Sequence, residues 1–138
     1  MSKDFVAYKG GEFQIEWYYS PKGESQPLEY YQQLPAGDRI KVLKLFRMMG
    51  EAGRISDESK FRNEGDKIYA FKPQPYRFLS FFVSGKKIIV TNAFRKKQDK
   101  LPKDEKERAM KCMESYKTRV AGRSYYEDEE KDGKDKYI

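Results

Sequence analysis

Apolar and polar residues alternate near the N-terminus and then follow a helical period. Residues 1–11 show neither pattern and are expected to be irregular. In residues 12–19 every second side chain up to Trp17 is apolar, which predicts a half-buried strand. Residues 27–34 are expected to form a short helix, because Ser25 suits its N-cap and a proline follows its last residue.

A second, longer helix is predicted over residues 36–52. Its apolar side chains form one wide face, made of Ile40, Val42, Leu43, Leu45, Phe46, Met48 and Met49. Asp38 places negative charge in the first turn, and Gly50 or Gly53 suits the C-terminal cap. The polar residues 55–66 that follow are expected to form a loop.

Three apolar and aromatic runs come next, at residues 67–72, 76–83 and 86–94. Two prolines separate the first two runs, and the short sequence SGKK lies between the second and the third. Connections this short favour antiparallel hairpins. Because the middle run is apolar on both faces, it is expected to be a central strand covered on both sides.

The last predicted element is a helix that begins at Pro102. Acidic residues lie in its first turns and basic residues beyond its middle, as the helix dipole favours. A narrow apolar stripe runs along it, made of Ala109, Met110, Met113, Tyr116 and Val120. Together the elements predict an α+β fold, in which one N-terminal strand and a three-strand meander form a small antiparallel sheet against two N-terminal helices and one C-terminal helix. Residues 1–122 would form this domain, and the charged residues 123–138 a mobile tail.

The composition adds a basic surface to this fold. Net charge is +7, and residues 86–123 contain 13 basic and 5 acidic residues. A segment this basic supports binding to a polyanion or to an acidic partner, although lysine-rich surfaces also serve solubility alone. Cys112 is the single cysteine and there is no histidine, so an intrachain disulfide and a Cys–His nucleophile are both excluded. With no membrane span or signal peptide in the pattern, a cytoplasmic protein fits best.

Cations gather where the three runs end, at Lys72, Arg77, Arg95, Lys96 and Lys97. In an antiparallel sheet these ends are expected to lie close together. A compact group of cations beside Tyr76 suits a phosphodiester backbone, which makes RNA or DNA the first partner to consider. Strand alternation sets one condition, because Tyr76 and Arg77 point to opposite faces unless the strand end is twisted.

Four short motifs follow one another in and after this region. They are IYAFK at 68–72, YRFLSFF at 76–82, NAFRKK at 92–97 and LPKDEKERA at 101–109. Their order and spacing resemble the RelE/HigB superfamily of bacterial and phage toxins, and most of all its phage-derived, HigB-like branch. The resemblance spans about residues 12–118 and implies a RelE-like fold.

The resemblance implies the toxin of a type II toxin–antitoxin system. Such a toxin is a small endoribonuclease that cuts messenger RNA, commonly in the ribosomal A site, and a cognate helix-turn-helix antitoxin neutralises it; no metal or cofactor is implied. Arg77 matches the strand arginine of the family, and Lys72 matches the basic residue that ends the preceding strand. Arg95, Lys96 and Lys97 match its F-x-K-K element. The chain departs from the family in having no histidine near this site.

Cleavage without a metal requires the 2′-hydroxyl to attack the adjacent phosphorus while the 5′-oxygen leaves. Fixed cations lower the barrier because the transition state carries more negative charge than the substrate. The expected catalytic residues are Arg77 as a bidentate clamp, Arg95 at the leaving side, and Lys72 as a base if burial and neighbouring cations lower its pKa. The residues expected to contact RNA are Tyr76, Lys96, Lys97 and Lys100.

Each of these residues also has an ordinary interpretation. Arg77 could pair with a carboxylate on a neighbouring strand, Tyr76 could pack in the core, and the lysines could form a solvated loop. The same fold could also serve as a non-catalytic RNA- or ribosome-binding module, or as a phage-encoded interaction protein that has lost the activity.

Overall fold

A computed structural model describes residues 5–126 of the chain. Its elements, in chain order, are β1 (Val6–Lys9), β2 (Gln14–Trp17), α1 (Gln26–Gln33), α2 (Ala36–Ala52), β3 (Phe61–Asn63), β4 (Tyr69–Phe71), β5 (Tyr76–Val83), β6 (Lys87–Arg95) and α3 (Lys103–Ala121). The helix predicted over 36–52 and the strand predicted over 76–83 are confirmed at both ends. The short helix α1 begins after Ser25, whose hydroxyl accepts a hydrogen bond from the N–H of Leu28 at 3.4 Å.

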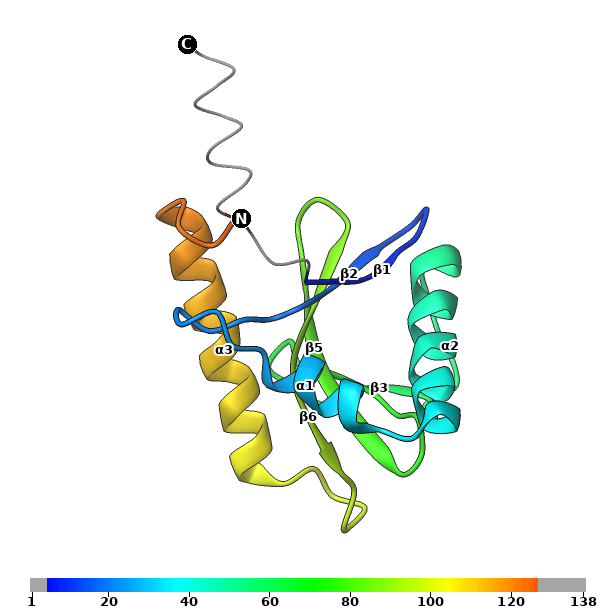
Figure 1. Cartoon of the computed structure of the whole chain (residues 1–138). Helices are drawn as coiled ribbons and strands as arrows, with labels where there is room; N and C mark the ends of the chain where they lie inside the picture. The colour runs from blue at the N-terminus through cyan, green and yellow to red at the C-terminus, as the bar shows by residue number, and fades with distance from the viewer. Residues whose placement is uncertain (1–4, 127–138) are drawn as a thin grey trace.

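The strands form one mixed sheet in the order β1-β2-β6-β5-β4-β3 (Figure 1). β2 and β6 run parallel, and the other neighbours are antiparallel. The antiparallel meander of β4, β5 and β6 is confirmed, but the expectation of a small, wholly antiparallel sheet is wrong. The chain leaves β2, passes through both N-terminal helices and returns along the meander. This long crossover lets β2 meet β6 in the same direction.

Two strands lie where the sequence shows no regular pattern. β1 falls in the segment expected to be irregular, and both of its end residues are exposed. β3 falls in the segment expected to be a loop, and it buries only Phe61. Both are edge strands, so their structure is set by pairing with one neighbour and not by an apolar period of their own.

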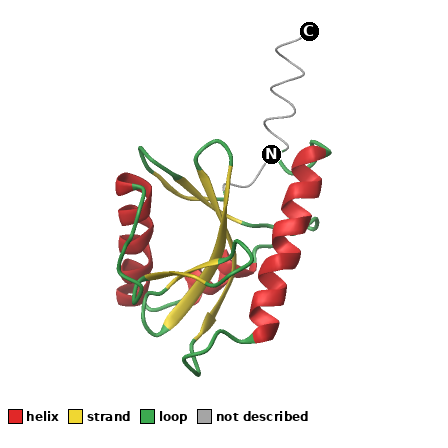
Figure 2. Ribbon diagram, turned by 180° about the vertical axis from the view of Figure 1, so that it is seen from behind, coloured by secondary structure: helices red, strands yellow, loops and turns green. Residues whose placement is uncertain are grey.

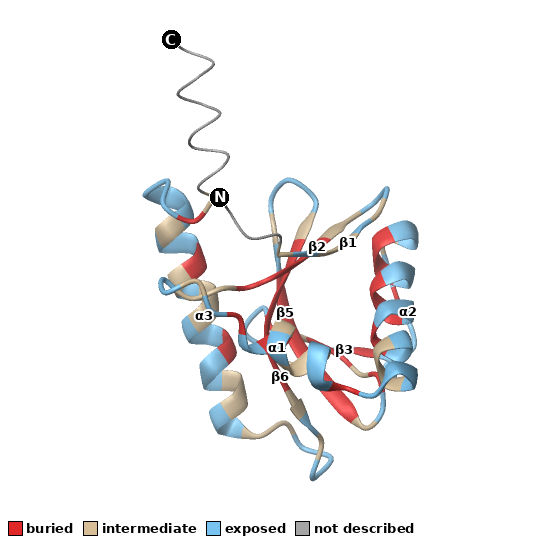
Figure 3. Ribbon diagram, viewed as in Figure 1, coloured by how far each residue is buried: buried red, intermediate tan, exposed pale blue. Residues whose placement is uncertain are grey.

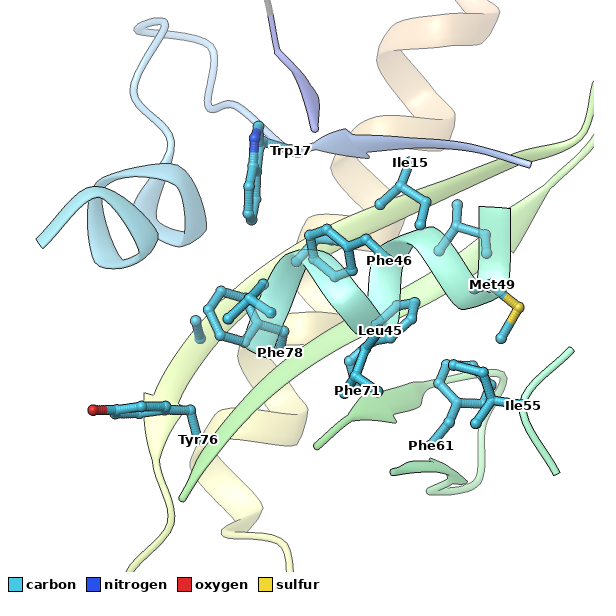
Figure 4. Close-up of a cluster of buried hydrophobic side chains, with 14 of the residues drawn as sticks. Ile15, Trp17, Leu45, Phe46, Met49, Ile55, Phe61, Phe71, Tyr76 and Phe78 are labelled. Atoms are coloured by element: carbon cyan, nitrogen blue, oxygen red, sulfur yellow. The ribbon is translucent and has the colours of Figure 1, made fainter. Parts of the chain in front are cut away.

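Helices cover both faces of the sheet (Figures 1 and 2). α1 and α2 pack on one face, where Trp17, Phe46 and Phe78 contact one another in the larger apolar cluster (Figure 4). α3 packs on the other face, where Ala109 and Tyr116 join a second cluster built on β5 and β6. Most of β5 is therefore buried on both sides, as predicted (Figure 3).

The β1–β2 hairpin closes over the end of α2 through two glycines. The N–H groups of Glu12 and Phe13 both donate to the carbonyl oxygen of Gly50, at 2.8 and 3.0 Å. A Cβ at Gly10 would lie 2.3 Å from that oxygen, so only glycine allows this close approach. Gly53, and not Gly50, caps the helix in a left-handed conformation with φ at +78°.

Gln26 fixes the start of α1 against the far end of β6. Its Nε2 donates to the carbonyl oxygen of Ala93, and its Oε1 accepts from the N–H of the same residue, both at 2.8 Å. The pairing of β2 with β6 reaches only to Val90. The side-chain amide therefore takes the place of a neighbouring strand, and it holds the end of β6 in position.

The packed domain continues past the end of α3. Tyr125 is 1% exposed, and its ring stacks on that of Tyr19 with the centroids 4.2 Å apart. The hydroxyl of Tyr126 donates to Oε1 of Glu16 at 2.7 Å. Tyr125 and Tyr126 therefore pack against the domain, and the rest of the expected tail, residues 127–138, lies outside the described residues. No helix within residues 5–126 is long and apolar enough to cross a membrane.

Candidate nucleic-acid interface

Three cations meet where the meander strands end, on the face that α3 covers. Lys72 directly follows β4, Arg77 is the second residue of β5, and Lys96 directly follows β6. In the β4–β5 register Phe71 pairs with Phe78, which places Lys72 opposite Arg77. Each of the three lies within electrostatic reach of another, because both Arg77 and Lys96 lower the pKa of Lys72. We refer to Lys72, Arg77 and Lys96 as the cation site.

The connection between β4 and β5 holds this site together through its backbone. The peptide bond between Gln74 and Pro75 is cis. The N–H of Lys96 donates to the carbonyl oxygen of Pro75 at 2.8 Å, and the N–H of Tyr76 donates to that of Pro73 at 2.9 Å. The proline loop therefore joins the end of β6 to the start of β5, and it holds Lys96 opposite Pro75.

Arg77 is buried, with 7% of its surface exposed. Its Nη1 donates to the carbonyl oxygen of Tyr76 at 2.8 Å and to Oε1 of Gln74 at 3.3 Å. Among residues 5–126 no carboxylate lies within 4.0 Å of the guanidinium, so a strand-to-strand ion pair is not its role in this structure. Burial lowers the pKa of Arg77, and the negative charges of Glu64 and Asp99 oppose that shift.

The guanidinium of Arg77 still has N–H groups to offer a ligand. Both of its hydrogen bonds to the protein use Nη1. Within the described chain every fully buried side-chain nitrogen has a partner, so the remaining nitrogens of Arg77 reach solvent. A planar fork held in place along one edge and open along another suits a bidentate contact with phosphate.

The surroundings of Lys72 lower the pKa of its amine. Its Nζ donates to the carbonyl oxygen of Glu58 at 3.0 Å. Burial lowers the pKa of Lys72, and the positive charges of Arg77 and Arg62 lower it further. The direction of this pKa shift is the one expected from the sequence, and its causes are the expected ones.

Lys96 carries a carboxylate partner from the loop that leads to α3. Its Nζ lies 2.8 Å from Oδ1 of Asp99. The hydrogen bond and the charge of Lys96 lower the pKa of Asp99, and Arg77 and Lys72 lower it as well. Lys97 and Lys100, on the same loop, are exposed.

Arg95 does not join the cation site, contrary to the expectation that all the strand-end cations lie together. It pairs with Tyr76 across β5 and β6, and its guanidinium lies 5.8 Å from the centroid of that ring, on the face covered by α1 and α2. The reason is the two-residue period of a strand, which sends Arg77 to one face and Tyr76 to the other. The predicted cluster is therefore split between two faces of the same strand end.

Tyr76 is a packed residue in this structure. It is 7% exposed and lies at the margin of the larger apolar cluster (Figure 4). Its hydroxyl donates to Oδ2 of Asp38 at 2.7 Å, and this bond raises the pKa of Tyr76. The ring also meets that of Tyr30 edge to face, at 6.1 Å. The ordinary interpretation of Tyr76 as a packing residue agrees with these contacts.

Sequence reasoning missed three charged residues of this region, which are Arg62, Glu64 and Asp99. Glu64 and Arg62 belong to the segment expected to be a loop, and the pairing of β3 with β4 brings them near Lys72. Asp99 lies in the motif region itself, two residues after Lys97, and its single negative charge among lysines was the available signal. Among residues 5–126 no group of three or more histidine, cysteine, aspartate or glutamate side chains could hold a metal ion.

Comparison with known protein families shows which family the chain belongs to. Residues 29–114, more than half of the chain, match the family described as "Phage derived protein Gp49-like (DUF891)", and the chain belongs to that family. It is a RelE-like family associated with toxin–antitoxin systems. The matched span contains the whole cation site, both prolines of its loop and most of α3. No curated protein matches the chain.

Proposed function

We propose that this protein is the toxin of a type II toxin–antitoxin system, in the HigB-like branch of the RelE/HigB superfamily, and that it cuts messenger RNA on the ribosome. The observation that carries the proposal is the cation site. Its three cations gather at one end of the meander, where β4 and β6 end and β5 begins, and its arginine keeps part of its fork open to solvent. The site lies inside the span that matches a toxin–antitoxin-associated family.

The proposed reaction forms a bond from the 2′-oxygen of one nucleotide to the adjacent phosphorus and breaks the bond to the 5′-oxygen. Its products are a 2′,3′-cyclic phosphate and a 5′-hydroxyl. Arg77 holds two phosphoryl oxygens and stabilises the charge that grows on them. Lys72, in its neutral form, accepts the proton of the 2′-hydroxyl, which its lowered pKa favours. Lys96 neutralises a phosphoryl oxygen beside Arg77.

In this proposal the remaining predicted residues act on the RNA on either side of the scissile phosphate. Arg95 lies on the opposite face of the strand end, so it contacts a neighbouring phosphate and not the leaving oxygen at the scissile one. The exposed Lys97 and Lys100 extend the same electrostatic track along the loop. The ring of Tyr76 makes a cation–π contact with the guanidinium of Arg95 and does not stack on a base.

The mechanism depends on the ribosome to position the RNA. The chain has no histidine, and the hydroxyl of Tyr76 is held by Asp38, so neither supplies the acid that protonates the 5′-oxygen. The leaving 5′-oxygen therefore takes its proton from solvent water, and a ribosome that orients the RNA lowers the barrier through positioning. The same observation favours a second candidate function, in which the protein binds RNA or the ribosome without cutting the message.

Expression in growing cells tests the proposal. The unaltered chain is expected to arrest growth, and Arg77→Ala to relieve the arrest, since removing one such donor costs about 100- to 1000-fold in rate. Lys44→Ala is the matched control, because Lys44 is an exposed cation on α2 and lies outside the matched strand motifs. Co-expression of a helix-turn-helix protein encoded beside this chain is expected to restore growth. An unaltered chain that leaves growth and messages intact would refute the toxin assignment.

The ends of the cut RNA separate the two candidate functions. Purified protein, ribosomes and a defined message are expected to yield fragments whose 5′-hydroxyls a kinase labels without prior phosphatase treatment. A single 2′-deoxy substitution at the cleaved nucleotide removes the attacking hydroxyl and is expected to abolish that cut. Sedimentation of the protein with ribosomes while the message stays whole would instead establish the non-catalytic function.

A further inference from the structure

Asp99 introduces a negative charge into the cation site. It lies on the connection between β6 and α3, and its Oδ1 is 2.8 Å from Nζ of Lys96. The charges of Lys96, Arg77 and Lys72 all lower its pKa. The carboxylate is therefore ionised at neutral pH and lies within the electrostatic field of all three cations.

The ion pair that Asp99 makes has little value for the fold. The side chain of Asp99 is 100% exposed and that of Lys96 is 30% exposed. Exposed pairs of this kind contribute little to folding stability. Asp99 also lies three residues after Lys96, on a loop without secondary structure, so its carboxylate can move away without breaking a helix or a strand.

We propose that Asp99 is an internal counter-ion of the cation site, which holds Lys96 in the free protein and releases it to a phosphate of bound RNA. The inference rests on the proposed function, in which RNA is the ligand. An isolated phosphate must compete with the carboxylate for Lys96, whereas a chain of phosphates also engages Arg77 and Lys72. Asp99 therefore lowers the affinity of the cation site for RNA.

The salt dependence of RNA binding tests this proposal. The probe is a short fluorescein-labelled RNA with 2′-O-methyl groups throughout, which cannot be cleaved, and binding is followed by anisotropy at several NaCl concentrations. Asp99→Asn is expected to tighten binding about 2- to 5-fold, the strength of an exposed ion pair. When RNA displaces Asp99, the freed carboxylate takes up a salt cation and so offsets part of the counterion release. Asp99→Asn removes this offset, so the slope of log K against log salt is expected to become more negative by up to about 0.7, the value of one phosphate contact.

Asp104→Asn is the matched control, since it makes the same change of charge on an exposed residue at the start of α3. It is expected to leave the slope unchanged. In a Lys96→Ala background, Asp99→Asn is expected to lose its effect on the slope. Equal slopes for Asp99→Asn and Asp104→Asn, or weaker binding by Asp99→Asn, overturn the proposal.

Heparin chromatography separates failure of this inference from failure of the proposed function. Heparin is a polyanion that the cation site binds whether or not RNA is the natural ligand. Asp99→Asn is expected to elute at higher salt than Asp104→Asn, and co-elution overturns the counter-ion role. Intact messages in the cleavage assay overturn the ribonuclease proposal, and they leave the heparin result to decide the role of Asp99.

Discussion

Two arginines on the α3 side of the sheet, Arg77 and Arg119, have opposite surroundings. The guanidinium of Arg119 lies over three tyrosine rings, at 5.8 Å from Tyr18, 5.2 Å from Tyr19 and 4.7 Å from Tyr125. Its Nη1 also donates to the carbonyl oxygen of Tyr19 at 2.8 Å. The protein itself supplies the electron-rich partners that this cation needs. Arg119 therefore stabilises the fold.

Arg77 has no aromatic partner of this kind among the described residues. It is buried, and its two hydrogen bonds leave part of the fork open to solvent. The charges of Glu64 and Asp99 oppose the effect of burial on its pKa, and Lys72 lies within electrostatic reach. Gathering like charges costs folding free energy. A site that carries this cost is typical of a surface that binds a ligand of opposite charge, which is the role proposed for Arg77.

The largest expected effect is on folding stability, at the tyrosine rings around Arg119. Tyr125→Ala removes a ring that is 1% exposed and that contacts Tyr18, Tyr19 and Arg119. The free energy of unfolding, measured by urea denaturation, is expected to fall by about 3–5 kcal/mol. Cleavage per folded molecule is expected to remain, because the ring lies away from the cation site. A folded variant with lost cleavage would show that the two regions are coupled.

The same substitution at both arginines, Arg77→Lys and Arg119→Lys, tests whether one acts in cleavage and the other in stability. Arg77→Lys keeps the charge but loses the planar fork, so cleavage is expected to fall about 10- to 100-fold, the worth of one charged hydrogen bond. Arg119→Lys is expected to leave cleavage unchanged and to lower the melting temperature. Equal losses of cleavage in both variants would mean that Arg77 acts through stability alone.

A smaller effect is expected from Tyr76→Phe. The variant loses the 2.7 Å hydrogen bond to Asp38 and keeps the packed ring under Arg95. The free energy of unfolding is expected to fall slightly, because one hydrogen bond to a carboxylate is lost, while RNA affinity and cleavage stay the same. Tyr30→Phe, on the neighbouring ring, serves as the control. A marked loss of cleavage with unchanged stability would assign Tyr76 a direct part in the reaction.

Much of this fold follows from the sequence where an element carries its own signal. α2 has a wide apolar face and a glycine stop, and β5 is apolar on both faces, so both were predictable to the residue. β1 and β3 have no such period and form only by pairing with β2 and β4. The parallel contact of β2 with β6 depends on a crossover whose direction no local pattern encodes.

The candidate site divides in a similar way. The pairing of Lys72 with Arg77 follows from short hairpins and from alternation, and it was predictable. Arg95 pairs with Tyr76, so strand alternation places it on the face opposite to Arg77. This pairing depends on a bulge near Leu79, and the sequence does not reveal that bulge. The isolated negative charge of Asp99 among lysines was visible in the sequence, but its contact with Lys96 was not predictable, because that contact depends on the conformation of an irregular loop.

The smallest effect is a pH dependence that isolates Lys72. Its pKa in the folded chain is lowered from the ordinary value of 10.5, chiefly by burial and then by Arg77. Between the lowered pKa and 10.5 the unfolded chain binds more protons than the native one, so the free energy of unfolding is expected to rise with pH across that window. If Lys72 is the base, log cleavage rate also rises with pH up to the lowered pKa and then levels off. Lys72→Met is expected to remove both trends, whereas Lys97→Met, an exposed lysine on the adjacent loop, keeps them. A rising limb that persists in Lys72→Met would move the base to another group while leaving the contrast between Arg77 and Arg119 intact.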